Sequence, residues 1–313
     1  MTAPGRIRLS ALVCIFLTAS LIPALDYGFG PGEETMTARR DVHRAILNQT
    51  ARTPDRYRVL SAAIVEVPTR VLAQFMPYER AYDRASLVFY LAAIAGMLAS
   101  LFAYLRRWFG DEPALIAALA VACTIRITMR QHDYAPGSYL EPTFVALALL
   151  AIINRRYGWL GALIAVATLN RETAIFLALL HLGTSDFSRQ AWIRTTAYVG
   201  IWAAIYGVVR TMGGDAERYW TMELVWRTNL SQPQLAVFNV SMLLGVFWVL
   251  AVLGWQYAPA FIRRSALIVP PYLLTVAIWG IWWEVRLLMP LYPILFALAL
   301  SYLFQPRAAA APG

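Results

Sequence analysis

Three short polar segments interrupt apolar stretches of this sequence, and each joins a basic side chain to a carboxylate. The first segment contains His132, Asp133 and Glu141, the second Arg171 and Glu172, and the third Glu284 and Arg286. A charged group among apolar neighbours lowers stability unless it is paired or binds a ligand. Two interpretations follow. The arginines pair with the carboxylates and tie helix ends together, or Arg58, Arg171 and Arg286 hold an anionic ligand.

Further ionisable side chains lie near the ends of apolar stretches, where such groups often mark a working site. Arg126 and Arg130 are four residues apart, so a helix would carry both on one face. Asp26 follows the first apolar stretch, and Asp41 lies in the long segment after it. We expect these groups to share one side of the molecule with the three polar segments. The alternative is that they are ordinary solvated loop charges.

The composition predicts an integral membrane protein. Of the 313 residues, 59% are hydrophobic and only 14% are charged, whereas about a quarter of a soluble domain is charged. The net charge is +9, and the basic residues other than histidine are all arginine. These arginines lie between apolar stretches and form no basic stripe, which argues against binding of nucleic acid.

Ten apolar segments could enter the membrane, because about 20 residues span it and shorter pieces need protein around them. They are 9–25, 85–105, 113–126, 139–154, 157–170, 173–184, 195–212, 237–258, 266–283 and 287–304. The sequence therefore predicts an all-α fold, a polytopic transmembrane helical bundle of about ten segments that forms a single domain over residues 1–313. The first segment is expected to remain as a span, with a cleaved signal peptide as the alternative.

Sets of arginines determine the predicted topology, because cytoplasmic loops are enriched in Arg and Lys. The sets are Arg6/Arg8, Arg106/Arg107, Arg155/Arg156, Arg189/Arg194, Arg263/Arg264 and Arg307. All of them, and both termini, lie on the cytoplasmic side only if residues 157–184 form two short helices that turn at Asn170. We therefore expect Arg171 and Glu172 at the extracytoplasmic face.

Two long segments fall on the extracytoplasmic side in this topology, 26–84 and 213–238. Within the first, apolar residues recur at helical spacing over 37–50 and 59–76. We expect two amphipathic helices on the outer membrane surface, with Glu66 on the polar side of the second.

Motifs of several enzyme classes are absent. There is no glycine-rich phosphate loop ending in Lys, no nucleophile elbow, no His-Glu-x-x-His and no Cys-x-x-Cys. The sequence leaves a divalent metal ion open without defining its site. Its available ligands would be His43, His132, Asp26 and Asp133.

The order of these features resembles the GT-C-type membrane glycosyltransferases, which use lipid-phosphate sugar donors. The resemblance covers most of the chain as architecture: a first span, a long outer loop with two surface helices, then paired short helices. It is specific in three patches, which are Arg56–Leu60, Leu169–Thr173, and Glu284–Arg286 followed by Leu291–Pro293.

This resemblance implies transfer of a sugar from a polyprenyl-phosphate-linked donor to a glycan, lipid or protein acceptor. Such proteins lie in the bacterial inner membrane among its lipids and act at its extracytoplasmic face. An acid in the first outer loop acts there as general base or metal ligand, which would assign the role to Asp26 or Asp41, with Asp133 as a second acid. Three arginines would hold the phosphate: Arg58, Arg171 and Arg286. The other candidate substrate-binding residues are Arg126, Arg130, His132, Glu141, Glu172 and Glu284.

Two other functions stay open. A transporter or flippase for an anionic or lipid-linked substrate would carry polar groups near the midplane, often in repeated halves. This chain gathers its polar segments on one predicted side and has no internal repeat. A non-catalytic protein of envelope assembly would tolerate the loss of individual outer acids.

Overall fold

Helices make up nearly all of the described structure. The computed structural model describes residues 7–128, 136–214 and 217–306. Its α-helices are α1 (Leu9–Phe29), α2 (Glu33–Leu47), α3 (Val59–Leu72), α4 (Tyr78–Phe109), α5 (Asp111–Thr128), α6 (Leu140–Ile153), α7 (Tyr157–Asn170), α8 (Ile175–Thr184), α9 (Arg189–Gly213), α10 (Met222–Ser231), α11 (Pro233–Leu244), α12 (Phe247–Gly254), α13 (Ala260–Ser265), α14 (Val269–Trp279) and α15 (Tyr292–Leu303). Short 3-10 helices lie between them: η1 (Asp55–Tyr57), η2 (Pro136–Tyr139), η3 (Glu172–Ala174), η4 (Ala266–Ile268) and η5 (Val285–Leu291). No strand occurs in these ranges, so the all-α prediction is confirmed.

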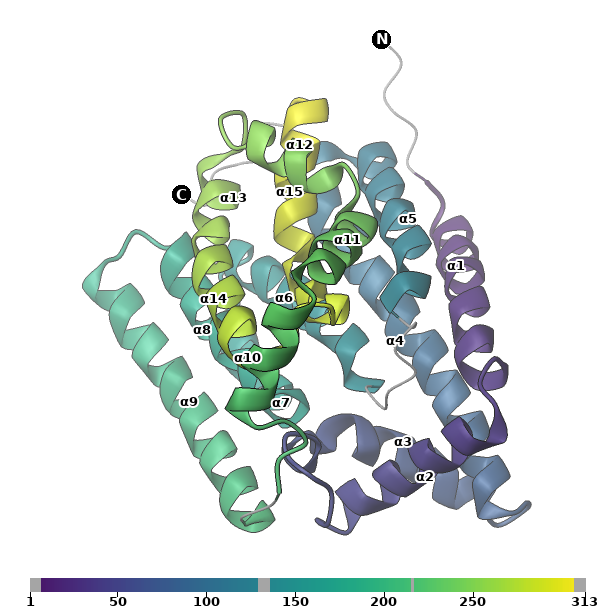
Figure 1. The fold of residues 1–313 in the computed structure, drawn as a ribbon. Helices are drawn as coiled ribbons and strands as arrows, with labels where there is room; N and C mark the ends of the chain where they lie inside the picture. The colour runs from purple at the N-terminus through teal and green to yellow at the C-terminus, as the bar shows by residue number, and fades with distance from the viewer. Residues whose placement is uncertain (1–6, 129–135, 215–216, 307–313) are drawn as a thin grey trace.

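The helices form an upright bundle that stands on a layer of two helices (Figure 1). Helices α2 and α3 lie together at the lower end, α1 and α4 run upward from this layer, and α9 forms the opposite edge. Helix α1 begins and α15 ends at the upper end, far from α2 and α3. The bundle therefore has two distinct ends, and the candidate site lies near the lower one.

The centre of the bundle is built around α15 and α4. In the apolar window of the η5–α15 segment 78% of the residues are buried, compared with 28% for α1. The inner face of α4 carries Ile94, Leu98, Leu101 and Leu105, each at most 2% exposed. This spacing of three and four residues places all four side chains on one helix face. Apolar packing therefore defines the core, and α1 lies at its edge.

Four helical segments are long and apolar enough to cross a membrane: Leu9–Phe29, Tyr78–Phe109, Ala260–Trp279 and Val285–Leu303. A fifth crossing results if α11 and α12, which meet at 74°, count as one broken span. Much of the outer surface is apolar, as on α1, where Leu9 and Ile22 are 76% and 69% exposed. By length and composition, four or five segments of the described chain can therefore cross a membrane, as in a membrane protein.

The prediction of about ten membrane segments is not confirmed. Each predicted segment is largely helical, but α6, α7 and α8 have only 14, 14 and 10 residues. Because a helix rises about 1.5 Å per residue, none of them can cross a hydrocarbon layer of roughly 30 Å alone. They form shorter apolar helices packed inside the bundle instead.

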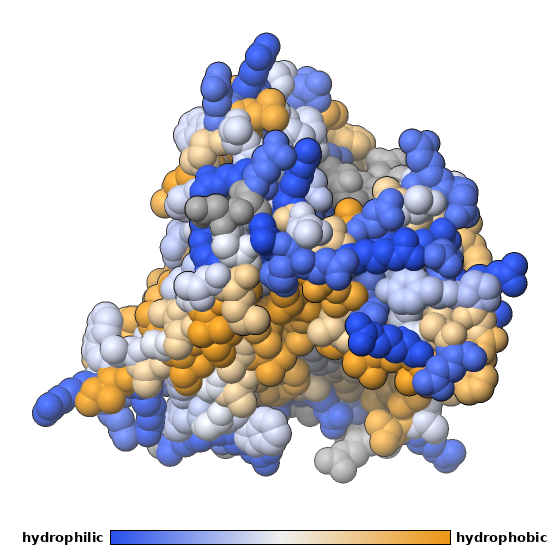
Figure 2. Space-filling model, turned by 90° about the horizontal axis from the view of Figure 1, so that it is seen from below, coloured by the Kyte–Doolittle hydropathy of each residue, from blue (hydrophilic) through white to orange (hydrophobic). Residues whose placement is uncertain are grey.

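The two predicted amphipathic helices are present, and each buries polar side chains on its inward face. The inward face of α2 consists of Met36, Arg39, His43 and Ile46. In α3 the carboxylate of Glu66 is buried, whereas Val67 and Val71 are 67% and 55% exposed. Figure 2 shows this lower end from below, with hydrophilic side chains over much of the surface and apolar side chains exposed between them. The periodicity located both helices and set Glu66 apart from Val67 and Val71, and the structure shows that the side with Glu66 faces the protein.

A hydrogen-bonded group explains why Glu66 faces inward. His43 Nε2 lies 3.1 Å from Glu66 Oε2, the Tyr78 hydroxyl donates to the same oxygen at 2.8 Å, and Arg70 Nε donates to Oε1 at 2.7 Å. Burial by itself would raise the pKa of Glu66, but these donors lower it. Burial lowers the pKa of His43 despite the nearby carboxylate. The contacts tie α2, α3 and α4 together beneath the candidate site.

Candidate functional site

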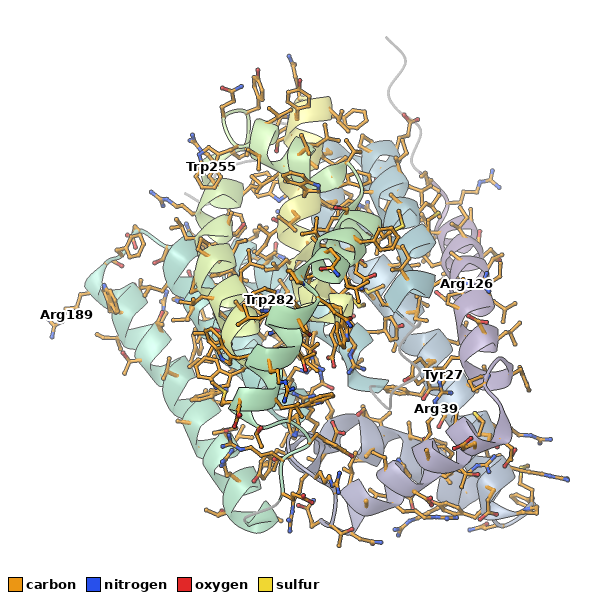
Figure 3. The ribbon with its side chains drawn as sticks, viewed as in Figure 1. Tyr27, Arg39, Arg126, Arg189, Trp255 and Trp282 are labelled. Atoms are coloured by element: carbon orange, nitrogen blue, oxygen red, sulfur yellow. The ribbon has the colours of Figure 1, made fainter. Side chains whose placement is uncertain are left out.

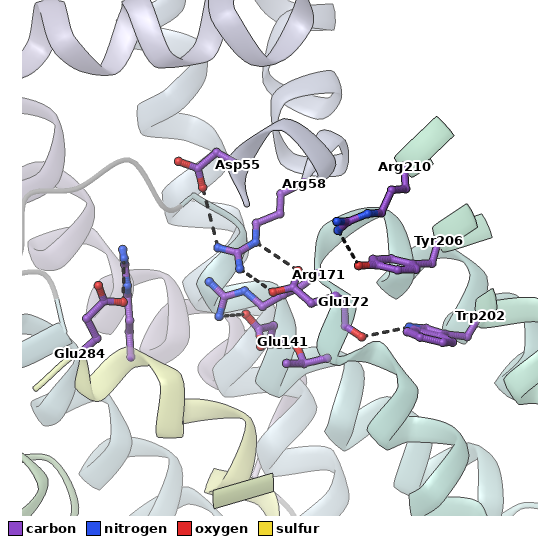
Figure 4. A network of polar contacts seen from close by, with 11 residues as sticks. Asp55, Arg58, Glu141, Arg171, Glu172, Trp202, Tyr206, Arg210 and Glu284 are labelled. Carbon is purple, nitrogen blue, oxygen red and sulfur yellow. Dashed lines mark hydrogen bonds and ion pairs between the residues drawn. The ribbon is translucent and has the colours of Figure 1, made fainter. Parts of the chain in front are cut away.

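Charged side chains from four separate parts of the chain lie in one region of the molecule (Figure 4). The first outer segment contributes Asp55 and Arg58, and the break between α7 and α8 contributes Arg171 and Glu172. Glu141 comes from the first turn of α6, and Glu284 and Arg286 come from the start of η5. We refer to these seven residues as the charge cluster.

Arg58 links the first outer segment to the break after α7. Its Nη2 donates to Glu172 Oε1 at 2.7 Å, and its Nη1 lies 3.8 Å from Asp55 Oδ1. Burial disfavours the charge on Arg58, but Glu172 and Asp55 outweigh that effect and raise its pKa. Arg58 therefore stays protonated and fixes two carboxylates.

Asp55 has weaker pairing than the other carboxylates of the cluster. Only 20% of its side chain is exposed, and its distance to Arg58 is too long for a strong hydrogen bond. Burial raises the pKa of Asp55, and the positive charges of Arg58, Arg286 and Arg171 act against that rise. A carboxylate with a raised pKa and no tight partner is better suited to accept a proton than one held in a short ion pair.

Arg171 and Glu141 form the most buried pair of the cluster. Arg171 Nη1 lies 2.5 Å from Glu141 Oε1, and the two side chains are 6% and 7% exposed. Arg171 adopts an extended backbone conformation between α7 and η3, which breaks the helix there. The predicted turn at Asn170–Glu172 is thus confirmed, and it turns Arg171 toward α6.

A second pair extends the cluster to η5. Arg286 Nη2 donates to Glu284 Oε2 at 3.2 Å, and the two side chains are 12% and 16% exposed. The loop before them is held by Asn229, which is 4% exposed. The Asn229 amide donates to the Gly280 carbonyl at 2.9 Å and accepts from the Trp282 backbone N–H at 2.8 Å. Helix α10 thereby positions the segment that carries Glu284 and Arg286.

Helix α9 presents a row of side chains along the other side of the cluster, spaced four residues apart. Trp202 donates to the Glu172 carbonyl at 3.0 Å and stacks on Tyr206 with ring centroids 5.1 Å apart. Arg210 donates to the Tyr206 hydroxyl and lies 5.0 Å from the ring centre of Tyr57. The row connects the helix break to the η1 turn.

The first outer segment is attached to the loop after α9 by backbone contacts, which we call the strap. Thr53 N–H donates to the Glu217 carbonyl at 2.9 Å, and Tyr219 N–H donates to the Thr53 carbonyl at 3.1 Å. The Tyr57 hydroxyl adds a hydrogen bond to the Gly214 carbonyl at 3.0 Å. The strap holds η1, and therefore Asp55 and Arg58, against the bundle.

A cavity opens beside the buried pair. Its polar wall consists of Glu141, Arg171, Thr173 and Tyr272. Its remaining walls are largely apolar and come from α6, α7, η3, α8, η4 and η5: Phe144, Val145, Ala167, Ala174, Phe176, Leu177, Ile268, Pro290 and Leu291. A site with a charged end and apolar walls fits an amphipathic molecule.

The structure gathers some predicted site residues and separates others. Arg58 pairs with Glu172, Arg171 with Glu141 and Arg286 with Glu284, and the charge of Arg286 acts on Asp55 and Arg171 from nearby. Asp26 pairs with Arg126 at 3.6 Å on the exposed side of α1 and α5, where both side chains are at least 40% exposed (Figure 3). Asp41 lies on the outer face of α2, 66% exposed and 3.9 Å from Arg44. Neither aspartate faces the cluster.

Three predicted residues, Arg130, His132 and Asp133, lie outside the described part of the chain. Asp55 was not among the predicted residues, although it lies three positions before Arg58. Its only sequence signal is its place beside the Arg56–Leu60 patch. Within the described ranges, no three His, Cys, Asp or Glu side chains are grouped to hold a metal ion.

Comparison with known proteins adds no relative. No family model, no curated protein and no solved structure matches the chain. The functional conclusion below therefore rests on the sequence pattern and the geometry of the charge cluster.

Proposed function

We propose that this protein is a membrane glycosyltransferase that transfers a sugar from a polyprenyl-phosphate-linked donor at the extracytoplasmic face. The observation that supports this most is the position of Asp55. This carboxylate of the first outer segment lies 3.8 Å from Arg58 and within electrostatic range of Arg171 and Arg286, and Arg171 in turn lines a cavity with largely apolar walls. This combination supplies a base, cations for a phosphate and an apolar wall beside them.

The chemistry assigns separate roles to these groups. An acceptor hydroxyl attacks the anomeric carbon of the donor sugar, and Asp55 takes the hydroxyl proton. The bond between that carbon and the phosphate oxygen breaks, and the lipid phosphate leaves with the electron pair. Arg286 and Arg171 stabilise its negative charge without giving up a proton. In this proposal Asp55 replaces Asp26 and Asp41 as the base.

The test is sugar transfer from polyprenyl-phosphate donors by the purified full-length protein in lipid nanodiscs. Asp55→Asn keeps the size of the side chain but cannot accept the proton, so we expect transfer to fall by roughly 10²- to 10⁴-fold. Asp41→Asn is the matched control on the same outer segment and should leave the rate unchanged. If Asp55→Asn is fully active, Asp55 is not the base. If the unmodified protein transfers no sugar from any of the donors, the proposed function is wrong.

A transporter of an anionic or lipid-linked substrate is the second candidate. Helices α11 and α12 meet at 74° and are together long and apolar enough for one broken span, and α7 ends at a buried arginine. Broken helices of this kind hold substrates in secondary transporters. Movement of a labelled lipid across proteoliposomes without sugar transfer would favour this alternative.

A further inference from the structure

Arg39 is a buried arginine outside the charge cluster. It lies on the inward face of α2 and is 3% exposed. Its guanidinium carbon lies 3.6 Å from the ring centre of Tyr27, and its Nη1 donates to the Tyr27 carbonyl oxygen at 2.7 Å. Figure 3 shows the two side chains together where α1 meets α2. The residue is thus removed from water by the protein itself.

The charge of Arg39 is not balanced in the way that its neighbours' charges are. Arg40 and Arg44 on the same helix each donate to a carboxylate at 2.7 Å, namely Asp83 and Glu79. Over the described residues, no carboxylate lies within ion-pair distance of Arg39, and its buried Nε has no hydrogen-bond partner. The other contact of its guanidinium is a weak one to Met36 Sδ at 3.6 Å. A buried cation with an unused donor is costly unless an anion completes its surroundings.

The tyrosine that packs against Arg39 is the first of three tyrosines in contact with one another. Tyr27 stacks on Tyr90 with ring centroids 3.5 Å apart, and Tyr90 contacts Tyr139 edge-to-face at 5.8 Å. Phenol hydroxyls can donate hydrogen bonds to an oxyanion and bring no competing negative charge. Arg39 and Arg286 both lie close enough to Tyr139 to act electrostatically on its hydroxyl, so Arg39 lies on the side of the charge cluster that contains Arg286. The surroundings are those of an anion site.

We propose that Arg39, together with Tyr27 and Tyr90, binds a phosphoryl oxyanion. The planar guanidinium presents donors in a fixed fork that matches a phosphate group, and the ring of Tyr27 holds this fork in place. The source of the group is either a lipid headgroup or free phosphate. If the lipid headgroup is that of a sugar donor, the inference rests on the proposed function. The binding of an anion at Arg39 does not depend on that function.

The experiment measures binding without turnover. The full-length protein in nanodiscs of neutral lipid is titrated with inorganic phosphate and, separately, with polyprenyl phosphate that carries no sugar. Heat of binding and melting temperature are recorded. We expect Arg39→Met to weaken binding by at least about tenfold, the loss expected from removing a charged donor. Arg40→Met is the matched control, because Arg40 already has carboxylate partners, and its binding should equal that of the unmodified protein.

Two further variants separate the possible outcomes. Arg39→Lys keeps the positive charge but lacks the planar fork of donors. We expect this variant to fold, and to bind phosphate more weakly than the unmodified protein does. Asp55→Asn should bind phosphate normally even if it transfers no sugar, which separates this inference from the proposed function. Binding of the lipid phosphate alone identifies a headgroup site, and binding of both identifies a general phosphoryl site. Equal binding by Arg39→Met, or no binding of either ligand by the unmodified protein, overturns the inference.

Discussion

Glu141 and Arg171 carry opposite charges in a place that water hardly reaches. Each side chain is less than 10% exposed, and Thr173 donates a further hydrogen bond to Glu141 at 3.4 Å. In such surroundings, the pair as a whole adds little stability, but the loss of one partner leaves a buried charge without compensation. The pair is therefore more important for the position of the helix break than for the net stability of the fold.

This leads to a prediction about single and double substitutions. Glu141→Gln removes one charge and should destabilise the protein by about 3 to 5 kcal/mol. The double variant Glu141→Gln with Arg171→Met removes both charges and should recover most of that loss. Thermal unfolding in detergent micelles measures both.

An exposed ion pair supplies the control. Arg52 and Glu217 lie 3.3 Å apart with side chains 55% and 76% exposed, so Glu217→Gln should change stability by about 1 kcal/mol or less. If the double variant at Glu141 and Arg171 is as unstable as the single one, loss of charge balance is not the cause.

At the level of elements, the η1 turn depends on the end of α9. A Cβ atom added at Gly213 would lie 2.8 Å from Tyr57 Cε1, closer than such contacts normally are. The Tyr57 ring cannot move freely, because its hydroxyl is bonded to Gly214 and Arg210 lies over its face. Gly213 therefore permits the close approach that seats η1 and its two charged residues.

Two glycines of α9 test this role. Gly213→Ala should push Tyr57 aside and cost about 1 to 3 kcal/mol, the usual range for overpacking. Gly207→Ala on the same helix has open space around its Cβ and should be neutral or stabilising by up to about 1 kcal/mol, because alanine favours a helix. The two melting temperatures, compared with that of the unmodified protein, give the answer. Equal stability of both variants would show that Tyr57 does not depend on this approach.

At the level of the whole molecule, helices connect the charge cluster to the sets of arginines. Helix α6 leads from Glu141 toward Arg155, and α7 returns to Asn170. Helix α8 then leads away from the cluster to Ser185, where Arg264 donates to its carbonyl at 3.2 Å, and α9 returns to Gly213. The described arginines at the far ends of these helices are thus separated from the cluster by the length of the helices, which is compatible with the predicted topology.

This arrangement predicts which residues are reached from outside the cell. In a full-length background with Cys14 and Cys123 replaced by serine, Glu217→Cys should react with a membrane-impermeant maleimide in intact cells. Arg107→Cys, at the end of α4, should react only after the membrane is opened, because arginine-rich ends stay in the cytoplasm. Both parent side chains are exposed from the protein. If Arg107→Cys is labelled in intact cells, the proposed topology is wrong.

The sequence by itself located the apolar helices and the break after Asn170, but not the 74° break between α11 and α12 within the predicted segment 237–258. Apolar length and helical spacing are local properties, so α7 was predicted with its observed bounds, and the polar residues after Asn170 correctly indicated an interruption. The same signal identified Arg171, Glu172, Glu284 and Arg286 as members of one site, since charges inside apolar sequence must find partners.

Only the tertiary structure decided which residues complete that site. Arg58 reaches Glu172 across 114 positions of the chain, and no local pattern encodes such a pairing. Asp55 faces the arginines because the strap holds η1 against the bundle, whereas Asp41 is turned outward by the rotation of α2. The inward faces of α2 and α3 were likewise fixed by polar partners such as Tyr27 and His43, because burial depends on what packs against a helix and not on its spacing alone.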